Sequence, residues 1–172
     1  MEVRALQLGD DRSAFRSGDP DLDSFLLKYA GQNQFRFHIG TTYVAVAAGR
    51  ILGYVTVSVG EIRSEERSPE LAARFPRYPL PVLRLVRLAV DQAARGLGIG
   101  KALLRFVLGM CLEQSARSGC IGVVVDAKPG AVDFYSRFEF TPLEGVAGLS
   151  PERPRPLPMF LALNRIRIAS KP

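Results

Sequence analysis

The spacing of hydrophobic side chains predicts a first helix over residues 19–34. Its apolar positions recur three and four residues apart, as on one face of an α-helix: Leu22, Phe25, Leu26 and Tyr29. Asp19 can accept hydrogen bonds from the free N–H groups of the first turn. Pro20 fits the first helical position because it has no N–H to satisfy. We therefore expect the helix to begin directly after Asp19.

Further apolar runs along the chain predict strands and two more helices. Residues 60–81 differ because they are polar, charged and proline-bearing, so we expect a long connection with a short helix after Ser68. The other expected elements, in chain order, are strands at 41–47, 51–59 and 82–91, a helix at 98–118, a strand at 121–127, a helix at 131–138, a loop at 145–155 and a strand at 156–164. This order predicts one α/β (α+β) domain over residues 1–172, in three layers, with a mixed central sheet and helices on both faces.

Composition narrows the class of protein. Hydrophobic residues make up 47% of the chain and charged residues 23%, which is typical of a soluble folded domain. No apolar stretch reaches the ~18 residues that a membrane span needs, and the first residues form no apolar leader core. We therefore expect a cytoplasmic protein without a membrane partner. The formal net charge of +6 favours an anionic partner, either a nucleic acid or a phosphorylated cofactor.

Histidine and cysteine usage excludes several kinds of site. His38 is the only histidine, so a histidine-based triad or metal site could exist only if His38 alone carried it. Cys111 and Cys120 lack the spacing of a metal-binding cluster, and we interpret them as two reduced structural thiols. We expect no metal site.

The strongest local signal is a glycine-rich turn between an apolar strand and a long helix. The strand ends in Leu88-Ala89-Val90, and the turn reads Arg95-Gly96-Leu97-Gly98-Ile99-Gly100. A helix start offers free N–H groups and the positive end of the helix dipole, and glycines let an anion approach the backbone closely. Arg95 and Lys101 add positive charge. The spacing matches neither the dinucleotide fingerprint nor the P-loop, and a turn without any ligand is the alternative.

Three segments together resemble the GNAT superfamily of N-acetyltransferases: Arg87-Leu88-Ala89-Val90, the turn Arg95-x-x-Gly98-x-Gly100, and Phe134-Tyr135-Ser136-Arg137-Phe138-Glu139-Phe140. The resemblance implies acetyl-CoA as cosubstrate, with its pyrophosphate on the amides of residues 96–101. It also implies that the backbone of residues 88–90 holds the pantetheine and polarises the thioester carbonyl. The cofactor-binding residues implied are Leu88, Ala89, Val90, Arg95, Gly96, Gly98, Ile99, Gly100, Lys101 and Phe138. Glu139 departs from the family pattern, which usually has glycine there.

The resemblance makes Tyr135 the candidate catalytic residue. Its phenol would protonate the departing thiolate as a general acid, and the alternative is a core tyrosine on an apolar helix face. No general base is equally evident, although Glu61 or Glu65 could serve. An α-amino group, with a pKa near ~7.7, is neutral at pH 7 far more often than a lysine amine near ~10.4. An enzyme without an evident base therefore suits an α-amino acceptor better.

A narrower resemblance concerns the acceptor. The segments that carry it are Leu22-Asp23-x-Phe25-Leu26, Ala30-x-Gln32-Asn33-Gln34, Thr42-Tyr43-Val44, Gly53-Tyr54, Tyr78-Pro79-Leu80-Pro81, Arg87-Leu88-Ala89-Val90-Asp91, Val123-Val124-Val125-Asp126-Ala127 and Pro158-Met159-Phe160-Leu161. They are similar to the GNAT toxins of type II toxin–antitoxin modules. Those enzymes acetylate the α-amino group of aminoacyl-tRNA, block translation, and are neutralised by a small DNA-binding antitoxin.

This second resemblance implies an aminoacyl-tRNA substrate, a small DNA-binding antitoxin as partner, and a homodimer. We assign substrate contacts to Asn33, Arg77 and Arg87, although Arg87 could instead be fixed within the sheet. Further basic residues could follow an RNA backbone: Lys28, Arg36, Arg74, Arg84, Arg95 and Lys101. Two alternatives stay open, namely a GNAT enzyme for a small-molecule amine or a protein N-terminus, and a non-catalytic module that keeps the coenzyme A pocket.

Overall fold

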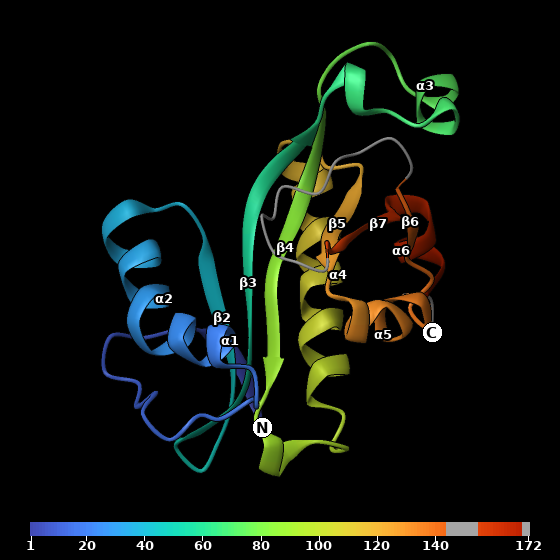
Figure 1. Cartoon of the computed structure of the whole chain (residues 1–172). Coiled ribbons are helices and arrows are strands. Elements are labelled where there is room, and N and C mark those ends of the chain that lie inside the picture. Colours follow the sequence, from blue (N-terminus) through green and yellow to red (C-terminus); the bar gives the residue numbers. More distant parts are fainter. Residues whose placement is uncertain (144–154, 170–172) are drawn as a thin grey trace. The chain divides into compact units, whose positions relative to one another are not determined.

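The computed structural model describes residues 1–143 and 155–169. They form a seven-stranded mixed sheet with the strand order β1-β2-β3-β4-β5-β7-β6, together with helices (Figure 1). The chain divides into two compact units, Met1–Ser58 with Leu85–Val107, and Val59–Arg84 with Leu108–Pro172. The fold class expected from the sequence is confirmed.

The elements have the following bounds. The strands are β1 (Glu2–Ala5), β2 (Thr41–Ala47), β3 (Arg50–Ile62), β4 (Leu80–Val90), β5 (Gly122–Ala127), β6 (Thr141–Pro142) and β7 (Leu157–Ala162). The α-helices are α1 (Pro20–Ser24), α2 (Ala30–Gln32), α3 (Pro69–Arg74), α4 (Ile99–Arg117), α5 (Val132–Ser136) and α6 (Leu163–Ala169). Two π-helical segments are η1 (Phe25–Tyr29) and η2 (Asn33–Phe37), and short 3₁₀ turns are η3 (Ser64–Glu66), η4 (Gln92–Ala94) and η5 (Pro129–Ala131). None of the helices in the described ranges is long and apolar enough to cross a membrane.

The first helix begins where the sequence predicts it. The Asp19 side chain accepts hydrogen bonds from the amides of Asp21 (3.0 Å) and Leu22 (3.3 Å), and Pro20 opens the first turn. The helical run continues through α1, η1, α2 and η2 and ends at Phe37, three residues beyond the expected end. His38 stops it in the left-handed conformation at a φ of 53°. A repeat of 3.6 residues cannot reveal the two π-helical segments, whose turns hold more residues.

In the first unit, helices cover both faces of the sheet. Tyr54 on β3 faces the N-terminal helical run: its ring lies 5.6 Å from that of Phe15 and 6.1 Å from that of Phe25, and its hydroxyl donates to the Leu22 carbonyl at 2.8 Å. Neighbouring residues on a strand point to opposite faces. Gly53 accordingly faces α4, where a Cβ on it would lie 2.8 Å from the Cγ2 of Ile99. A side chain at position 53 would push α4 away from the sheet.

The edge strand β1 of the first unit was not expected from the sequence. Its four residues, Glu2–Ala5, pair antiparallel with β2, which pairs antiparallel with β3 across a bulge between Ala45 and Val46. The burial of β1 is incomplete on both faces, so its sequence lacks the strict alternation that predicts a strand.

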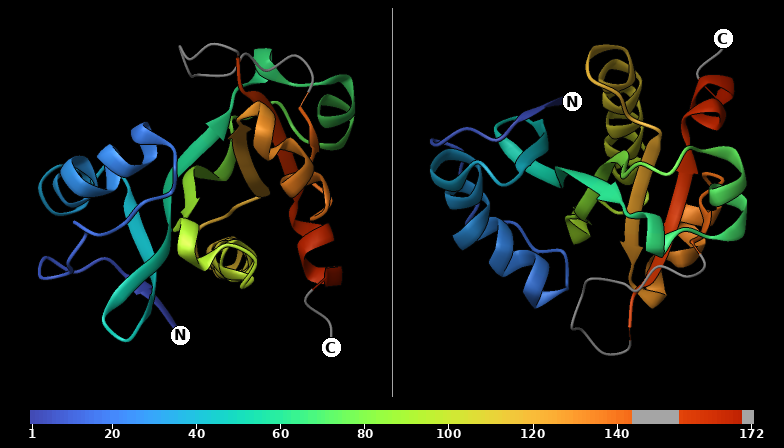
Figure 2. Two further views of the ribbon diagram at one scale, coloured as in Figure 1. Left: turned by 60° about the horizontal axis from the view of Figure 1, so that its bottom comes forward. Right: turned by 90° about the horizontal axis from the view of Figure 1, so that it is seen from above.

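In the second unit, β7 pairs antiparallel with both β5 and β6 (Figure 2). β5 is buried almost throughout, as its continuous apolar run predicts. The short helix expected after Ser68 is α3, and the Ser68 hydroxyl caps it by accepting from the Leu71 amide at 3.3 Å. Leu71 joins a core with Ile62, Val82 and Phe160.

The last strands of the chain differ from those predicted from the sequence. The final strand ends at Ala162 rather than at residue 164, because residues 163–169 form α6, and the two-residue strand β6 was not expected. Pairing with β7, a tertiary contact, creates β6. The loop expected at 145–155 falls almost entirely outside the described residues.

Candidate functional site

The glycine-rich turn predicted to hold a phosphate lies between β4 and α4 in the first unit. Gly96 and Gly98 have φ angles of 78° and 76°, a left-handed conformation that side chains other than glycine's rarely adopt. A Cβ at either position would meet nothing within 4 Å, so the space in front of the backbone is open. The first helical amides, at Ile99, Gly100 and Lys101, have no carbonyl four residues earlier within the helix and can bind an anion.

Asp91 organises the start of this turn. Its carboxylate is buried and accepts hydrogen bonds from the amides of Arg16 (3.0 Å) and Ala93 (2.9 Å) and from the guanidinium of Arg50 (3.1 Å). Burial alone would raise the pKa of this carboxyl, but the three donors outweigh it and hold the pKa below its ordinary value. From the sequence we predict no role for Asp91, which follows the apolar strand directly. An aspartate between an apolar strand and a turn was the signal that could have identified its capping role.

Five other residues implied to bind the cofactor also lie in the first unit, namely Leu88, Ala89, Val90, Arg95 and Lys101, whereas Phe138 lies in the second. Ala89 is buried in the core, whereas Leu88 and Val90 are half-buried. The Arg95 guanidinium donates to the carbonyl of Ser17, so this side chain ties the turn to the loop before α1. Lys101 is exposed on the first turn of α4. Its positive charge therefore belongs to the same segment as the free amides.

The three residues assigned to the substrate are not in one unit. Asn33 and Arg87 belong to the first unit and Arg77 to the second. The Arg87 guanidinium lies 4.0 Å from the centre of the Phe25 ring, a cation–π contact that favours the interpretation in which it is fixed in the fold. Arg77 is exposed, in a segment held by Arg67, whose guanidinium donates to the carbonyls of Phe75, Pro76 and Tyr78.

Tyr135 lies on α5 in the second unit and is 4% exposed. Its ring packs edge-on against Phe134 (5.1 Å) and Phe140 (5.5 Å), and burial raises the pKa of its phenol. A raised pKa keeps the phenol protonated, which a hydrogen-bond donor requires. Phe138, half-buried, packs on Phe134 at 5.2 Å. Tyr135 is therefore packed like a core residue, and its phenol keeps the proton that a general acid needs.

The turn after α5 explains the family's usual glycine. Glu139 stands there with a φ of 66°, in the left-handed region, while the amides of Glu139 and Phe140 close the helix on the carbonyls of Ser136 (3.0 Å) and Tyr135 (3.2 Å). The turn that a glycine would make is thus kept, at the cost of backbone strain in Glu139.

The two candidate bases are both in the second unit and accessible. Glu61, on β3, forms an ion pair with Arg63 at 3.6 Å with about half of its side chain exposed. Glu65 is exposed in η3. Neither shows the burial that would tune a carboxylate for proton abstraction.

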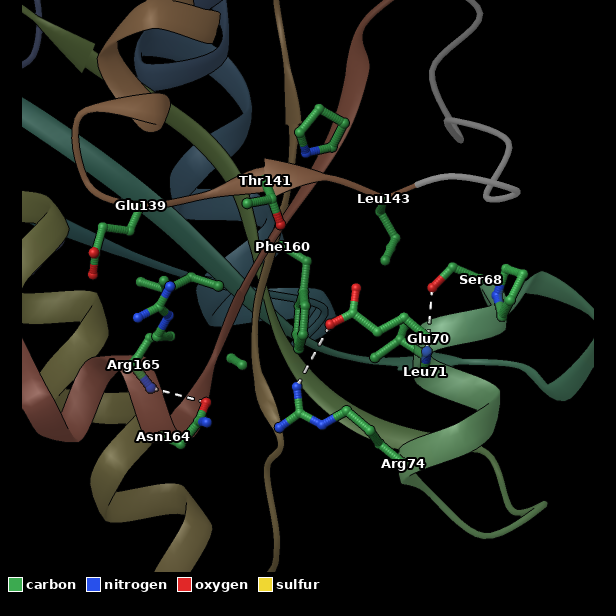
Figure 3. Close-up of a pocket in the computed structure, with 14 residues that line it drawn as sticks. Ser68, Glu70, Leu71, Arg74, Glu139, Thr141, Leu143, Phe160, Asn164 and Arg165 are labelled. Atoms are coloured by element: carbon green, nitrogen blue, oxygen red, sulfur yellow. Dashed lines mark hydrogen bonds and ion pairs between the residues drawn. The ribbon is translucent and has the colours of Figure 1, made fainter.

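A pocket of about 530 Å³ lies in the second unit, and its lining includes none of the residues implied to bind cofactor or substrate. Figure 3 shows Glu70, Leu71 and Arg74 of α3 on one side and Glu139, Asn164 and Arg165 on the other, with Phe160 between them. Glu70 and Arg74 are 3.9 Å apart as an ion pair. Its lining mixes charges of both signs, so the pocket shows no preference for an anion.

Comparison with known proteins identifies the family. The family model described as Acetyltransferase (GNAT) domain matches residues 38–142, well over half of the chain. The chain belongs to the GNAT acetyltransferase family. A curated relative, the tRNA-acetylating toxin of Mycobacterium tuberculosis (strain ATCC 25618 / H37Rv), is 32% identical to this GNAT protein over 138 residues, which cover 80% of this chain and 82% of the relative.

Solved structures share the fold of this GNAT protein over nearly the whole chain. The toxin AtaT complexed with acetyl-methionyl-tRNAfMet has a TM-score of 0.83 and 23% identity, over 99% of each chain. A tyrosine-to-phenylalanine variant of AtaT, bound to the C-terminus of the antitoxin AtaR and to acetyl-CoA, has a TM-score of 0.78 and 22% identity, over 98% of this chain and 97% of that one. The expected resemblance to GNAT toxins is confirmed.

Proposed function

We propose that this GNAT protein transfers an acetyl group from acetyl-CoA to the α-amino group of an aminoacyl-tRNA and thereby blocks translation. The observation that carries the proposal is the 32% identity, over four fifths of the chain, to a tRNA-acetylating toxin. AtaT, which has the same fold, supports both ligands, since its structures contain acetyl-CoA and an acetylated aminoacyl-tRNA.

The glycine-rich turn fits acetyl-CoA on its own geometry. Positive φ angles at Gly96 and Gly98 leave open space before the backbone, and the amides of residues 99–101 offer donors to a pyrophosphate. Lys101 adds a cation on the first turn of α4, and Asp91 fixes η4, just before the glycine-rich turn, through the Ala93 amide. Acetyl-CoA supplies the thioester, whose carbonyl the backbone of residues 88–90 would polarise.

Tyr135 is proposed to protonate the departing thiolate of coenzyme A. Its raised pKa makes full proton transfer to a thiol of pKa about 8.5 uphill, so the phenol would act mainly as a hydrogen-bond donor to the developing negative charge. The acceptor needs no strong base, because an α-amino group near pKa ~7.7 is partly neutral at pH 7. Glu61 or Glu65 would take up the released proton directly or through water.

A surface on the N-terminal helical run is proposed to contact the RNA. Residues 24–60 contain no acidic residue. Within residues 27–39, hereafter the 27–39 surface, five large hydrophobic side chains are exposed: Leu27, Tyr29, Phe35, Phe37 and Ile39. Lys28 and Arg36 lie among them, and the Arg36 guanidinium is 5.2 Å from the centre of the Phe37 ring. Cations for phosphates beside aromatic rings for unpaired bases suit single-stranded RNA, such as an acceptor end.

The remaining partners are proposed from the relatives. We infer that the protein is a cytoplasmic homodimer, as its resemblance to the GNAT toxins implies. We also infer that a small DNA-binding antitoxin neutralises it, since the toxin AtaT binds the C-terminus of the antitoxin AtaR. A short open reading frame next to the gene, whose product restores growth when both are expressed, would support the antitoxin. Light scattering of the purified protein tests the dimer, and a monomer at micromolar concentration would contradict it.

The acceptor can be tested by offering purified protein radiolabelled acetyl-CoA with aminoacyl-tRNA, uncharged tRNA, a peptide N-terminus or small amines. We expect label on aminoacyl-tRNA only. Substituting Tyr135→Phe should lower kcat about 10²-fold, while Tyr43→Phe should not. The pair Lys28→Ala and Arg36→Ala should raise KM for aminoacyl-tRNA several-fold without changing KM for acetyl-CoA.

The controls separate the parts of this proposal. Replacing the exposed Arg105 and Arg117 of α4 by alanine removes the same charge outside the 27–39 surface and should leave KM for aminoacyl-tRNA unchanged. Label on small amines or peptides alone would overturn the acceptor. An unchanged kcat for Tyr135→Phe would overturn the acid assignment alone.

A further inference from the structure

Two buried cysteines lie next to each other in the second unit, and neither has a role in the acetyl transfer proposed above. Cys111 is on α4 and Cys120 lies just before β5, nine residues later. Their Sγ atoms are 3.3 Å apart. A disulfide needs a separation of about 2.05 Å, so the two sulfurs have to approach by only roughly 1.3 Å.

The two thiols have different surroundings. Cys111 is fully buried, while Cys120 is 5% exposed. The Cys111 thiol can donate a hydrogen bond to the Cys120 sulfur, and this contact lowers the pKa of Cys120 despite burial. The same arrangement raises the pKa of Cys111. The Cys120 thiol, when protonated, donates to the Gly122 carbonyl at 3.3 Å. Because Cys120 is also the more exposed of the two, an oxidant reaches it first, and Cys111 is the thiol that follows it.

We propose that Cys111 and Cys120 are a modification site, a dithiol that a small hydroperoxide oxidises to an intramolecular disulfide. The Cys120 thiolate attacks a peroxide oxygen, the O–O bond breaks, and a sulfenic acid forms at Cys120 while the hydroxide takes up a proton as water. The Cys111 sulfur then attacks the Cys120 sulfur, the S–O bond breaks, and hydroxide leaves with the Cys111 proton as a second water. The two thiols lose two electrons, and the peroxide gains them.

Burial selects the oxidant. Hydrogen peroxide is about the size of water and can reach a cysteine that is only 5% exposed, whereas a bulky disulfide such as oxidised glutathione cannot align with its sulfur. The bond formed would tie α4 to the start of β5 through a short loop. Such a cross-link restricts the unfolded chain, so the oxidised protein should unfold at a higher temperature.

The test treats the folded full-length protein with hydrogen peroxide and measures its intact mass after alkylation under denaturing conditions. We expect a loss of two hydrogens, no alkylation at either cysteine, reversal by dithiothreitol, and a rise of several degrees in the unfolding midpoint. Cys111→Ser should accumulate a dimedone-reactive sulfenic acid at Cys120, whereas Cys120→Ser should form none at Cys111. Oxidised glutathione should leave both thiols free.

Three outcomes would overturn the proposal. These are two thiols that stay free at a peroxide dose that oxidises free cysteine, added oxygen without a disulfide, and a disulfide between molecules only. A glutathione adduct would refute the selection of a small oxidant. The mass of the unsubstituted protein decides the matter even where a serine variant does not fold. The result is independent of the acetyl transfer proposed above.

Discussion

Asp91 occupies the point at which β4 ends and the glycine-rich turn begins, and three donors from separate segments converge on its carboxylate. One is an amide of the loop before α1, one is an amide of the turn itself, and one is the Arg50 guanidinium. The residue thus joins the turn to the rest of the first unit. The turn's motif was recognisable from the sequence, but the residues that brace it come from positions far apart in the chain.

Replacing Asp91→Asn should lower the free energy of unfolding by about 1–3 kcal/mol at pH 7, because an amide cannot accept from all three donors as a carboxylate does. The lowered pKa of Asp91 means that its contribution is present above the unfolded value of about 3.9 and is lost as the pH falls through the lower folded value. Urea unfolding at several pH values checks both effects.

The control for this prediction is Glu113→Gln, which removes an exposed carboxylate on α4 that is 4.0 Å from Arg117. Its effect on stability should be within a few tenths of a kcal/mol at every pH. A difference between the protein and its Asp91→Asn variant that persisted unchanged well below pH 3 would contradict the role of the charge.

Glu139 shows how a departure from a family pattern can leave the backbone unchanged. Glu139 stands where the family usually has glycine, and the structure keeps the left-handed turn with a φ of 66°. Glu139→Gly should therefore raise the free energy of unfolding by about 0.5–1 kcal/mol, since relief of strain exceeds the added freedom of glycine in the unfolded chain.

Glu139→Ala is the matched control, because it removes the carboxylate but keeps a Cβ at the strained position. It should bring no gain in stability. Equal gains from both substitutions, measured by urea unfolding, would assign the effect to the charge of Glu139 instead of its backbone.

At the scale of elements, the predictions succeeded where the signal is local in sequence and failed where the element depends on tertiary contacts. The start of the first helix, the short helix α3 after Ser68 and the apolar run of β5 depend on neighbours in sequence, and all three were predicted. β1 and β6 depend on strand partners distant in sequence, and the two π-helical segments depart from the 3.6-residue repeat on which the helix prediction rests. A single sequence contains no local pattern for these.

The close approach of α4 to β3 gives a direct test at this scale. A Cβ at Gly53 would lie 2.8 Å from the Cγ2 of Ile99 and 2.9 Å from the Ala89 carbonyl oxygen, so Gly53→Ala should destabilise the protein by about 1–3 kcal/mol. Gly109→Ala is the matched control, since its Cβ would meet nothing within 4 Å and alanine favours a helix.

The control should be neutral or stabilising by up to about 1 kcal/mol. Thermal unfolding of the two alanine variants distinguishes them. Equal stability of both variants would show that α4 can shift away from β3 without cost, contrary to the packing described.

At the scale of the whole molecule, a net charge of +6 and an acid-free stretch over residues 24–60 agree with an anionic macromolecule as acceptor. The GNAT family was predicted from three short segments, because the residues of each motif, including those of the glycine-rich turn, are contiguous in the chain. The residues predicted to contact the substrate, Asn33, Arg77 and Arg87, rest on weaker signals, because a polar or basic side chain looks the same in a sequence whether it binds a ligand or serves the fold. Arg87, stacked on Phe25, illustrates that a basic residue can serve the fold.

The central claim concerns one covalent product. After incubation of the protein with acetyl-CoA and a mixture of aminoacyl-tRNAs, nuclease digestion releases the terminal aminoacyl-adenosines, whose masses can be measured. The account predicts at least one aminoacyl-adenosine carrying an added acetyl group on its α-amine, formed only with acetyl-CoA and much more slowly with Tyr135→Phe. Unmodified aminoacyl-adenosines beside rapid acetylation of small amines or peptide N-termini would contradict it.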